Sequence, residues 1–343
     1  MIPTPTGATT LFLCFSAIVQ FPLPCQTGEP KRQTLNVKEK HRFKGGVTLK
    51  NFVFSPDGNL LAGKDREAIV VWEVSSGREK ARIESREYLA PLAFSSDSRL
   101  ITWTVGSVIE GKTMRSWDIE KNQEGPVLRL GPGAAFLTFF PDGKHFLVRM
   151  RKAIVLEKRD AKTGLRIGEP YELGNDSPYK AFSSQDARLL AALNFEQGIQ
   201  IWRIDTQELL ATLKGHTGNI QEVCFSVCGK RVASACWDKT VRIWDTKTGD
   251  TLHKFSSRDV PVTVDFSPDG KWLAIGYIAT TSRISIFDAK DGEELLSWQP
   301  ERANSLSLAF SPDGKLLACT GGNSFQVFEI TVQKGPPVEK KKE

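Results

Sequence analysis

Short apolar runs separated by polar turns recur along most of the chain. In the best-formed stretch, residues 214–249, the runs VASA (residues 232–235) and VRIW (residues 241–244) are bounded by Gly, Asp and Lys-Thr-Gly. Runs of this length, rich in Val and Ile and bounded by turn residues, favour β-strands. The stretch therefore predicts three short strands joined by two tight turns. No apolar run of the sequence approaches the ~18 residues that a membrane-spanning helix requires.

One turn sequence recurs seven times, and its first copy reads Phe-Ser-Pro-Asp-Gly at residues 54–58. Proline presets the φ angle of a tight turn, aspartate bonds its own backbone, and glycine accepts a positive φ. The copies lie 40 to 45 residues apart, at residues 54–58, 94–98, 139–143, 182–186, 225–229, 266–270 and 310–314. Such a period indicates a repeat architecture rather than two unrelated domains.

A second mark follows each turn, usually an aromatic residue that precedes an acidic one, as in Trp244-Asp245. The aromatic positions are Trp72, Trp117, Trp202, Trp244, Phe287 and Phe328, with Arg159 in the third unit. We expect these side chains to pack between neighbouring sheets.

Together the two marks make the chain resemble the WD-repeat family over about residues 33–330, with residues 214–249 as the best copy. The resemblance implies an all-β fold: a seven-bladed β-propeller of four-stranded antiparallel blades. The last unit lacks an outer strand of its own. Residues 33–43 resemble the N-terminal strand that closes the ring in this family, and closure would remove exposed strand edges.

Three regions follow from this interpretation. Residues 31–334 form the propeller, and residues 335–343 (GPPVEKKKE) form a disordered basic tail. Residues 1–30 form a signal peptide or an apolar leader, since residues 1–28 carry no charge and residues 11–19 are apolar. A cleaved leader predicts export to the periplasm or the extracellular space. Otherwise the protein is cytoplasmic, which the absence of a disulfide framework favours.

The resemblance also implies a hydrogen-bonded structural tetrad in the fifth unit, formed by His216, Ser234, Asp238 and Trp244. These residues include the types of a Ser-His-Asp nucleophile. A buried strut accounts for all four, however, and Ser234 would lie within a strand. The four histidines are far apart in sequence and the cysteines lack zinc-site spacing. We therefore expect no metal ion and no cofactor.

In this family, one face of the ring resembles a platform for partners. It carries the loops before each innermost strand and those between the second and third strands. Large side chains of the kind that dominate interfaces are predicted on these loops: Arg66, Tyr88, Trp103, Tyr179, Phe195, Trp237 and Tyr277. Trp237 is the strongest candidate, because the family accepts almost any residue at its position.

We therefore expect a non-catalytic, monomeric scaffold that binds a protein or peptide. The alternative is an enzyme or small-ligand binder that uses the central channel. Among the residues that come three before each repeated Phe, only Glu222 is a carboxylate, so a paired-carboxylate mechanism lacks parts.

Charge adds little to this picture. The net charge of +6 is modest and dispersed, so no nucleic-acid partner is expected. The third unit holds a basic cluster, Lys144, Arg149, Arg151, Lys152, Lys158, Arg159 and Lys162. A solvated face explains this cluster better than an anionic partner site, because no aromatic residue is interleaved for base stacking.

Overall fold

The structure, a computed structural model, describes residues 34–44, 52–65, 68–84, 92–107, 111–150, 154–174, 178, 180–194, 198–278, 282–301, 306–321 and 324–333. These residues belong to one compact unit, Gln33–Lys334. Within them, no helix is long and apolar enough to cross a membrane. The leader at residues 1–30 and the tail at residues 335–343 lie outside the described residues and remain predictions.

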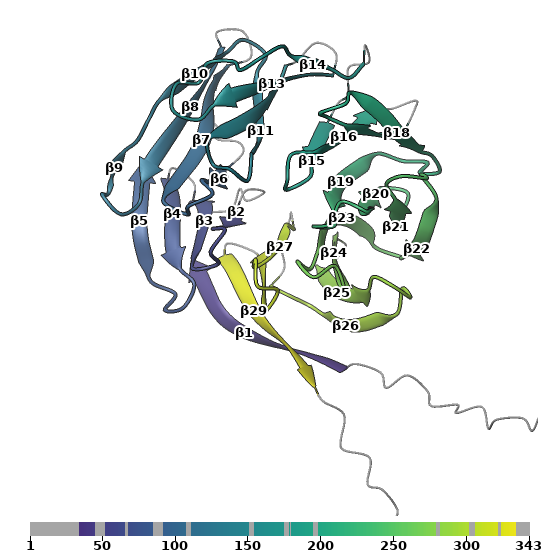
Figure 1. Ribbon diagram of the computed structural model, residues 1–343. Coiled ribbons are helices and arrows are strands. Elements are labelled where there is room, and N and C mark those ends of the chain that lie inside the picture. The colour runs from purple at the N-terminus through teal and green to yellow at the C-terminus, as the bar shows by residue number, and fades with distance from the viewer. Residues whose placement is uncertain are drawn as a thin grey trace, which may run out of the picture. The chain divides into compact units, whose positions relative to one another are not determined.

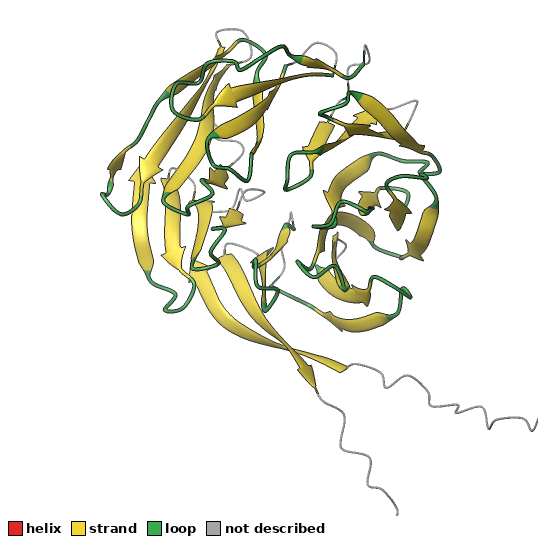
Figure 2. Cartoon of the chain, viewed as in Figure 1, coloured by secondary structure: helices red, strands yellow, loops and turns green. Residues whose placement is uncertain are grey.

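The described strands form seven sheets (Figures 1 and 2). The first blade contains β2 (Phe52–Phe54), β3 (Leu60–Asp65), β4 (Ala68–Glu73) and β5 (Glu79–Glu84). The second contains β6 (Leu92–Phe94), β7 (Leu100–Ser107) and β8 (Gly111–Asp118), with β9 (Gln123–Glu124) and β10 (Leu128–Gly131) both paired to β8. The third contains β11 (Ala135–Phe139), β12 (His145–Arg149), β13 (Val155–Asp160) and β14 (Tyr171–Glu172).

The remaining blades repeat the pattern. The fourth contains β15 (Lys180–Ser183), β16 (Leu189–Asn194), β17 (Gly198–Arg203) and β18 (Glu208–Leu213). The fifth contains β19 (Ile220–Phe225), β20 (Arg231–Cys236), β21 (Thr240–Asp245) and β22 (Thr251–Ser256). The sixth contains β23 (Val260–Phe266), β24 (Trp272–Ile278), β25 (Arg283–Asp288) and β26 (Glu294–Trp298). The seventh contains β27 (Leu308–Phe310), β28 (Leu316–Gly321), β29 (Ser324–Gln333) and β1 (Thr34–Lys44).

The sheets are antiparallel and follow one another in chain order around a ring, as Figure 1 shows. The first strand of a blade contacts the first strand of a neighbouring blade, as β19 contacts β23 and β23 contacts β27. The seven-bladed propeller expected from the sequence is confirmed. Inner strands therefore line the centre of the ring, and the turns between strands lie on its two faces.

The ring closes through its first and last strands. β1 pairs antiparallel with β29, from Thr34 opposite Gln333 to Lys44 opposite Ser324. Leu35 and Phe43 of β1 are each only 4% exposed, so this strand contributes to the hydrophobic core as well as to hydrogen bonding. The predicted closure by an N-terminal strand is confirmed.

The repeated turn is held by its serine and aspartate. Ser55 Oγ donates to Asp57 Oδ1 at 2.5 Å and accepts from the amide of Leu60 at 2.9 Å, while Gly58 has φ +75°. In the fourth blade this turn lies one residue later than predicted. There Ser184 donates to Asp186, and Ala187 occupies the glycine position with φ +55°. A second serine next to the first had made the two alignments hard to distinguish from the sequence.

The aromatic positions lie between blades as expected. Trp244 is 1% exposed, and Trp72 is 5% exposed. In the third blade, Arg159 occupies the position that is aromatic in the other blades, and it makes polar contacts. Its guanidinium forms an ion pair with Glu157 at 2.6 Å and donates to the carbonyl of Arg129 in the second blade.

Candidate partner-binding face

The turn between β20 and β21, residues 237–239, lies on the face that the sequence analysis assigned to partners. The amide of Trp237 donates to the carbonyl of Asn219 at 2.9 Å, which ties the turn to the loop before β19. Lys239 closes the turn in a left-handed conformation, with φ +63°. Two adjacent loops of this face are therefore joined at Trp237.

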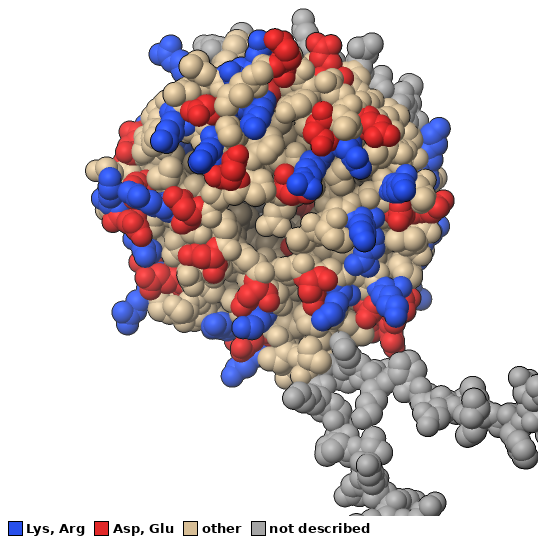
Figure 3. All heavy atoms as spheres, viewed as in Figure 1, with Lys and Arg blue, Asp and Glu red and all other residues tan. Residues whose placement is uncertain are grey.

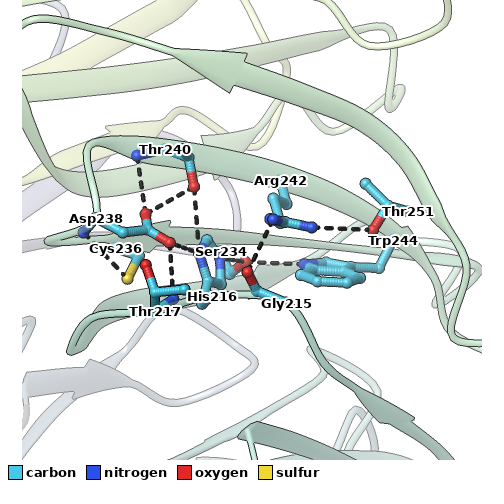
Figure 4. Close-up of polar contacts among 10 residues, drawn as sticks. All are labelled: Gly215, His216, Thr217, Ser234, Cys236, Asp238, Thr240, Arg242, Trp244 and Thr251. Carbon is cyan, nitrogen blue, oxygen red and sulfur yellow. Dashed lines mark hydrogen bonds and ion pairs between the residues drawn. The ribbon is translucent and has the colours of Figure 1, made fainter.

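Behind this turn, a chain of hydrogen bonds crosses the fifth blade (Figure 4). Trp244 Nε1 donates to Ser234 Oγ at 2.8 Å, and Ser234 Oγ lies 2.8 Å from His216 Nε2. His216 Nδ1 lies 2.9 Å from Asp238 Oδ2. Asp238 Oδ1 accepts from both the amide and the hydroxyl of Thr240, at 3.0 and 2.7 Å. The sequence-predicted tetrad residues are thus brought together in a single network.

The charges of this network follow from burial. Burial lowers the pKa of His216 despite the opposing effect of Asp238, so the imidazole is neutral at pH 7. Burial opposes ionisation of Asp238, but hydrogen bonds from Thr240, His216 and Thr217 hold its pKa well below the usual range. The ionised carboxylate requires the proton on His216 Nδ1. His216 Nε2 therefore accepts from the Ser234 hydroxyl, whose oxygen accepts from the indole.

The hydrogen bonds of this network indicate a structural role rather than a catalytic one. Ser234 is fully buried, and its oxygen already serves two partners, so no substrate can reach it. His216, Cys236 and Asp238 also place possible metal-donor atoms within 4.8 Å of one another. Burial raises the pKa of Cys236 to about 11, however, and its sulfur accepts the amide of Asp238. A protonated thiol and an engaged imidazole suit a hydrogen-bonded strut better than a metal site.

The structure separates the predicted partner-binding residues. The Trp237 side chain is 57% exposed, the largest exposed aromatic among the described residues. Trp103 and Tyr277, in contrast, are only 4% and 2% exposed, and their prediction as surface contacts is corrected. Both belong to second strands, on the side that packs into the core, and the Arg283 guanidinium lies 4.1 Å from the Tyr277 ring centre.

The other predicted contacts are Arg66, Tyr88, Tyr179 and Phe195, and they lie outside the described residues. Lys112, the second residue of β8, also lies on this face and was not singled out by the sequence analysis. The charge of Arg149 in the next blade acts on it, and no local sequence signal could have revealed this relation.

Two carboxylates near the centre of the ring join adjacent blades. Glu222 Oε2 accepts from the amide of Val264 at 3.3 Å, and Asp265 Oδ2 accepts from the amide of Phe310 at 2.8 Å. Burial, reinforced by the charge of Glu222, raises the pKa of Asp265 to about 7. Both side chains therefore link inner strands of adjacent blades.

Comparison with known protein families supports the repeat interpretation. The sequence model described as "WD domain, G-beta repeat" matches residues 207–245, which span β18 to β21. The chain is a WD-repeat protein. The matched copy is the same unit that the repeat analysis found to be best formed.

This WD-repeat protein is similar in sequence to several curated proteins. It is 29% identical over 162 residues to small ribosomal subunit protein RACK1 of Caenorhabditis elegans, covering 44% of this chain and 49% of the relative. It is 33% identical over 145 residues to human pre-mRNA-processing factor 17, covering 41% and 25%. It is 36% identical over 101 residues to the mouse periodic tryptophan protein 2 homolog, covering 28% and 10%. The matches span half or less of these relatives.

Proposed function

We propose that this WD-repeat protein is a non-catalytic scaffold that binds a protein or peptide on the face that carries Trp237. The supporting observation is the 57% exposure of this indole on a turn fixed by the Asn219 carbonyl and the Asp238 carboxylate. Tryptophan is enriched among the residues that dominate interfaces. A contact residue is also more effective when its supporting shell is rigid.

The relatives support the class of function. Their names place one in the small ribosomal subunit and describe another as a pre-mRNA-processing factor. Ribosomes and the machinery that processes pre-mRNA are large assemblies, so these names support a role in binding other macromolecules.

The test is a crosslinking pull-down with the full chain, its Trp237→Ala variant and a Val227→Ala control. Val227 is 51% exposed and lies in a turn on the opposite face, between β19 and β20. We expect a partner captured by the full chain and by the control to be lost by Trp237→Ala. Capture of the same partner by all three proteins would contradict the assignment to this face.

We propose further that the protein acts inside the cell. The names of the ribosomal and pre-mRNA-processing relatives support this choice over export. The test is fractionation of cells that produce the full chain, followed by N-terminal sequencing of the isolated protein. An intracellular protein that retains residues 1–30 is expected. Recovery outside the cytoplasm with a new N-terminus near residue 31 would support the exported alternative.

The alternative function, a small-ligand or catalytic site in the central channel, is favoured by one observation. Glu222 and Asp265 place two partly buried carboxylates on adjacent inner strands. If Trp237→Ala and the full chain both capture nothing, a small ligand that binds in the channel becomes the better explanation. In that case Glu222→Gln would weaken its binding and Val227→Ala would not.

A further inference from the structure

Two basic side chains flank one short connection between the second and third blades. Lys112 of β8 lies opposite Gly131 of β10, and Arg149 of β12 lies opposite Ala135 of β11. Residues 131–135 form the link between these two blades. The chain is close-packed here, because a Cβ built on Gly111 would lie 3.3 Å from the carbonyl carbon of Gly131. Both basic residues border turns between second and third strands, on the same face as Trp237.

Neither side chain has a partner in the described part of the chain. Lys112 and Arg149 are both partly buried, yet neither forms a hydrogen bond or an ion pair there. Three other arginines of the same blades are paired with carboxylates: Arg99 with Asp118 at 3.0 Å, Arg115 with Glu124 at 2.7 Å and Arg159 with Glu157 at 2.6 Å. The unpaired Arg129 and Arg166 are exposed to solvent. Lys112 and Arg149 differ from both groups, because they are partly buried without a carboxylate partner among the described residues.

The surroundings of the two side chains disfavour their charged forms. Burial lowers the pKa of Lys112, and the nearby charge of Arg149 lowers it further. Burial also lowers the pKa of Arg149. Like charges held together while partly withdrawn from water cost free energy unless an anion compensates them. A pair that forms no hydrogen bond or ion pair with the described residues and is electrostatically unfavourable fits a ligand site better than a structural one.

We propose that Lys112 and Arg149 bind an anionic segment of the partner protein on this face. The segment would place either a phosphorylated side chain or two adjacent carboxylates between the ammonium and guanidinium groups. The planar guanidinium offers two parallel donors to such oxygens, and the lysine adds a point charge. This inference rests on the proposed function and names the chemistry of the partner.

The test uses the full-length protein and fluorescence anisotropy, with three versions of a short labelled Gly/Ser peptide. One version carries a phosphoserine, one carries Glu-Glu in its place, and one is neutral. A labelled single-stranded oligonucleotide is the fourth probe. Lys112→Gln/Arg149→Gln is compared with Lys144→Gln/Arg188→Gln. The control removes the same charge from exposed turns on the opposite face.

We expect the phosphorylated or the di-glutamate peptide to bind more tightly than the neutral one. We expect the first variant to weaken that binding about tenfold or more and the control to leave it unchanged. The tighter of the two charged peptides identifies the source of the anion. The proposal is overturned if the neutral peptide binds as well, if the control loses binding equally, or if only the oligonucleotide depends on the pair.

Denaturant unfolding supplies a second readout. Lys112→Gln/Arg149→Gln is expected to unfold at the same or a higher denaturant concentration, since it removes an uncompensated repulsion. A clear loss of stability would instead show a structural role and overturn the proposal. The Trp237→Ala variant separates this site from the proposed function. If it retains both the anionic peptide and the captured partner, the Trp237 contact fails while the anion site stands.

Discussion

The hydroxyl group of Ser234 links two other side chains of the fifth-blade network. Ser234 Oγ accepts from Trp244 Nε1 and donates to His216 Nε2, and all three groups lie in or against the core. Buried polar groups must be hydrogen-bonded, and removing one partner leaves the others unsatisfied. The effect of a small change at Ser234 should therefore exceed the value of one ordinary hydrogen bond.

We expect Ser234→Ala to destabilise the protein by about 2–4 kcal/mol, because two buried groups each lose a partner. Urea unfolding measures the change. Ser76→Ala is the control, since that serine makes an exposed contact with Glu73. A loss for Ser234→Ala no larger than that of the control would show that the network contributes little to stability.

Trp244→Ala should cost about 3–5 kcal/mol, the usual range for a large-to-small change in a core. The fifth blade offers a matched control in Trp237→Ala, the same substitution at a side chain that is 57% exposed. Surface substitutions usually change stability by less than about 0.5 kcal/mol. Guanidinium unfolding of the two variants should separate them clearly. Equal losses would contradict the burial of Trp244 between blades.

Asp265 should make stability fall as pH rises. Its pKa is about 7 in the folded protein, whereas an unfolded aspartate titrates near its ordinary value of 3.8. Between these pH values the folded state binds more protons than the unfolded state, so raising the pH favours unfolding. The low pKa values of His216 and Asp238 act in the opposite direction, since their stabilisation is lost as pH falls.

Asp265→Asn isolates the first effect. We expect the difference in unfolding free energy between Asp265→Asn and the original protein to shift by about 2–4 kcal/mol between pH 4 and pH 8, in favour of the variant at high pH. Urea unfolding across this range provides the measurement. A difference that stays constant with pH would show that Asp265 titrates normally in the fold.

At the scale of elements, the sequence predicted strands and turns well and side-chain placement less well. The Ser-Pro-Asp-Gly turns are local, so residues such as Asp57 and Gly58 identify them without reference to the rest of the fold. The burial of Trp103 and Tyr277 depends on which side of a strand faces the next blade. A shift of one residue reverses that side, and the period alone does not determine it.

The Lys112–Arg149 pair shows a different limit. The two residues belong to different blades, and each lies opposite one end of the short link between β10 and β11. Each residue alone is an ordinary surface cation in the sequence. That neither has an ion-pair partner among the described residues is a property of the folded chain, which neither strand's sequence shows.

The closing strand offers a test at this scale. We expect removal of residues 1–44 to leave β29 without its outer neighbour and to expose the apolar surface covered by Leu35 and Phe43. The truncated chain should associate in light scattering and unfold at lower urea concentration, because uncovered strand edges pair with other chains. Removal of residues 1–32, which retains β1, is the control. Identical behaviour of the two truncations would argue against a stabilising role for β1.

Over the whole molecule, charge is mixed rather than concentrated. The chain carries 46 Lys and Arg against 40 Asp and Glu, and both signs are interspersed on the face shown in Figure 3. The face drawn there therefore has no extended patch of one sign that would attract a polyanion. Selectivity for a partner should therefore come from local features such as Trp237 and the Lys112–Arg149 pair.

It follows that the intact protein should not bind a random single-stranded oligonucleotide at about 0.15 M salt, where surface charges are screened beyond about 8 Å. Anisotropy titration tests this, with a basic nucleic-acid-binding domain as the positive control. Micromolar binding with a steep salt dependence would contradict the expectation and favour a polyanion as the partner.

The pairing of Thr34 with Gln333 also has a consequence for synthesis. A ribosome adds about 5–20 residues per second, so β1 emerges about 15–60 s before the strand it pairs with. During that interval six blades can assemble while β1 has no partner strand. A chain that stops early keeps both of its free edges, and only the last ten or so residues of the propeller convert a row of folded blades into a closed ring.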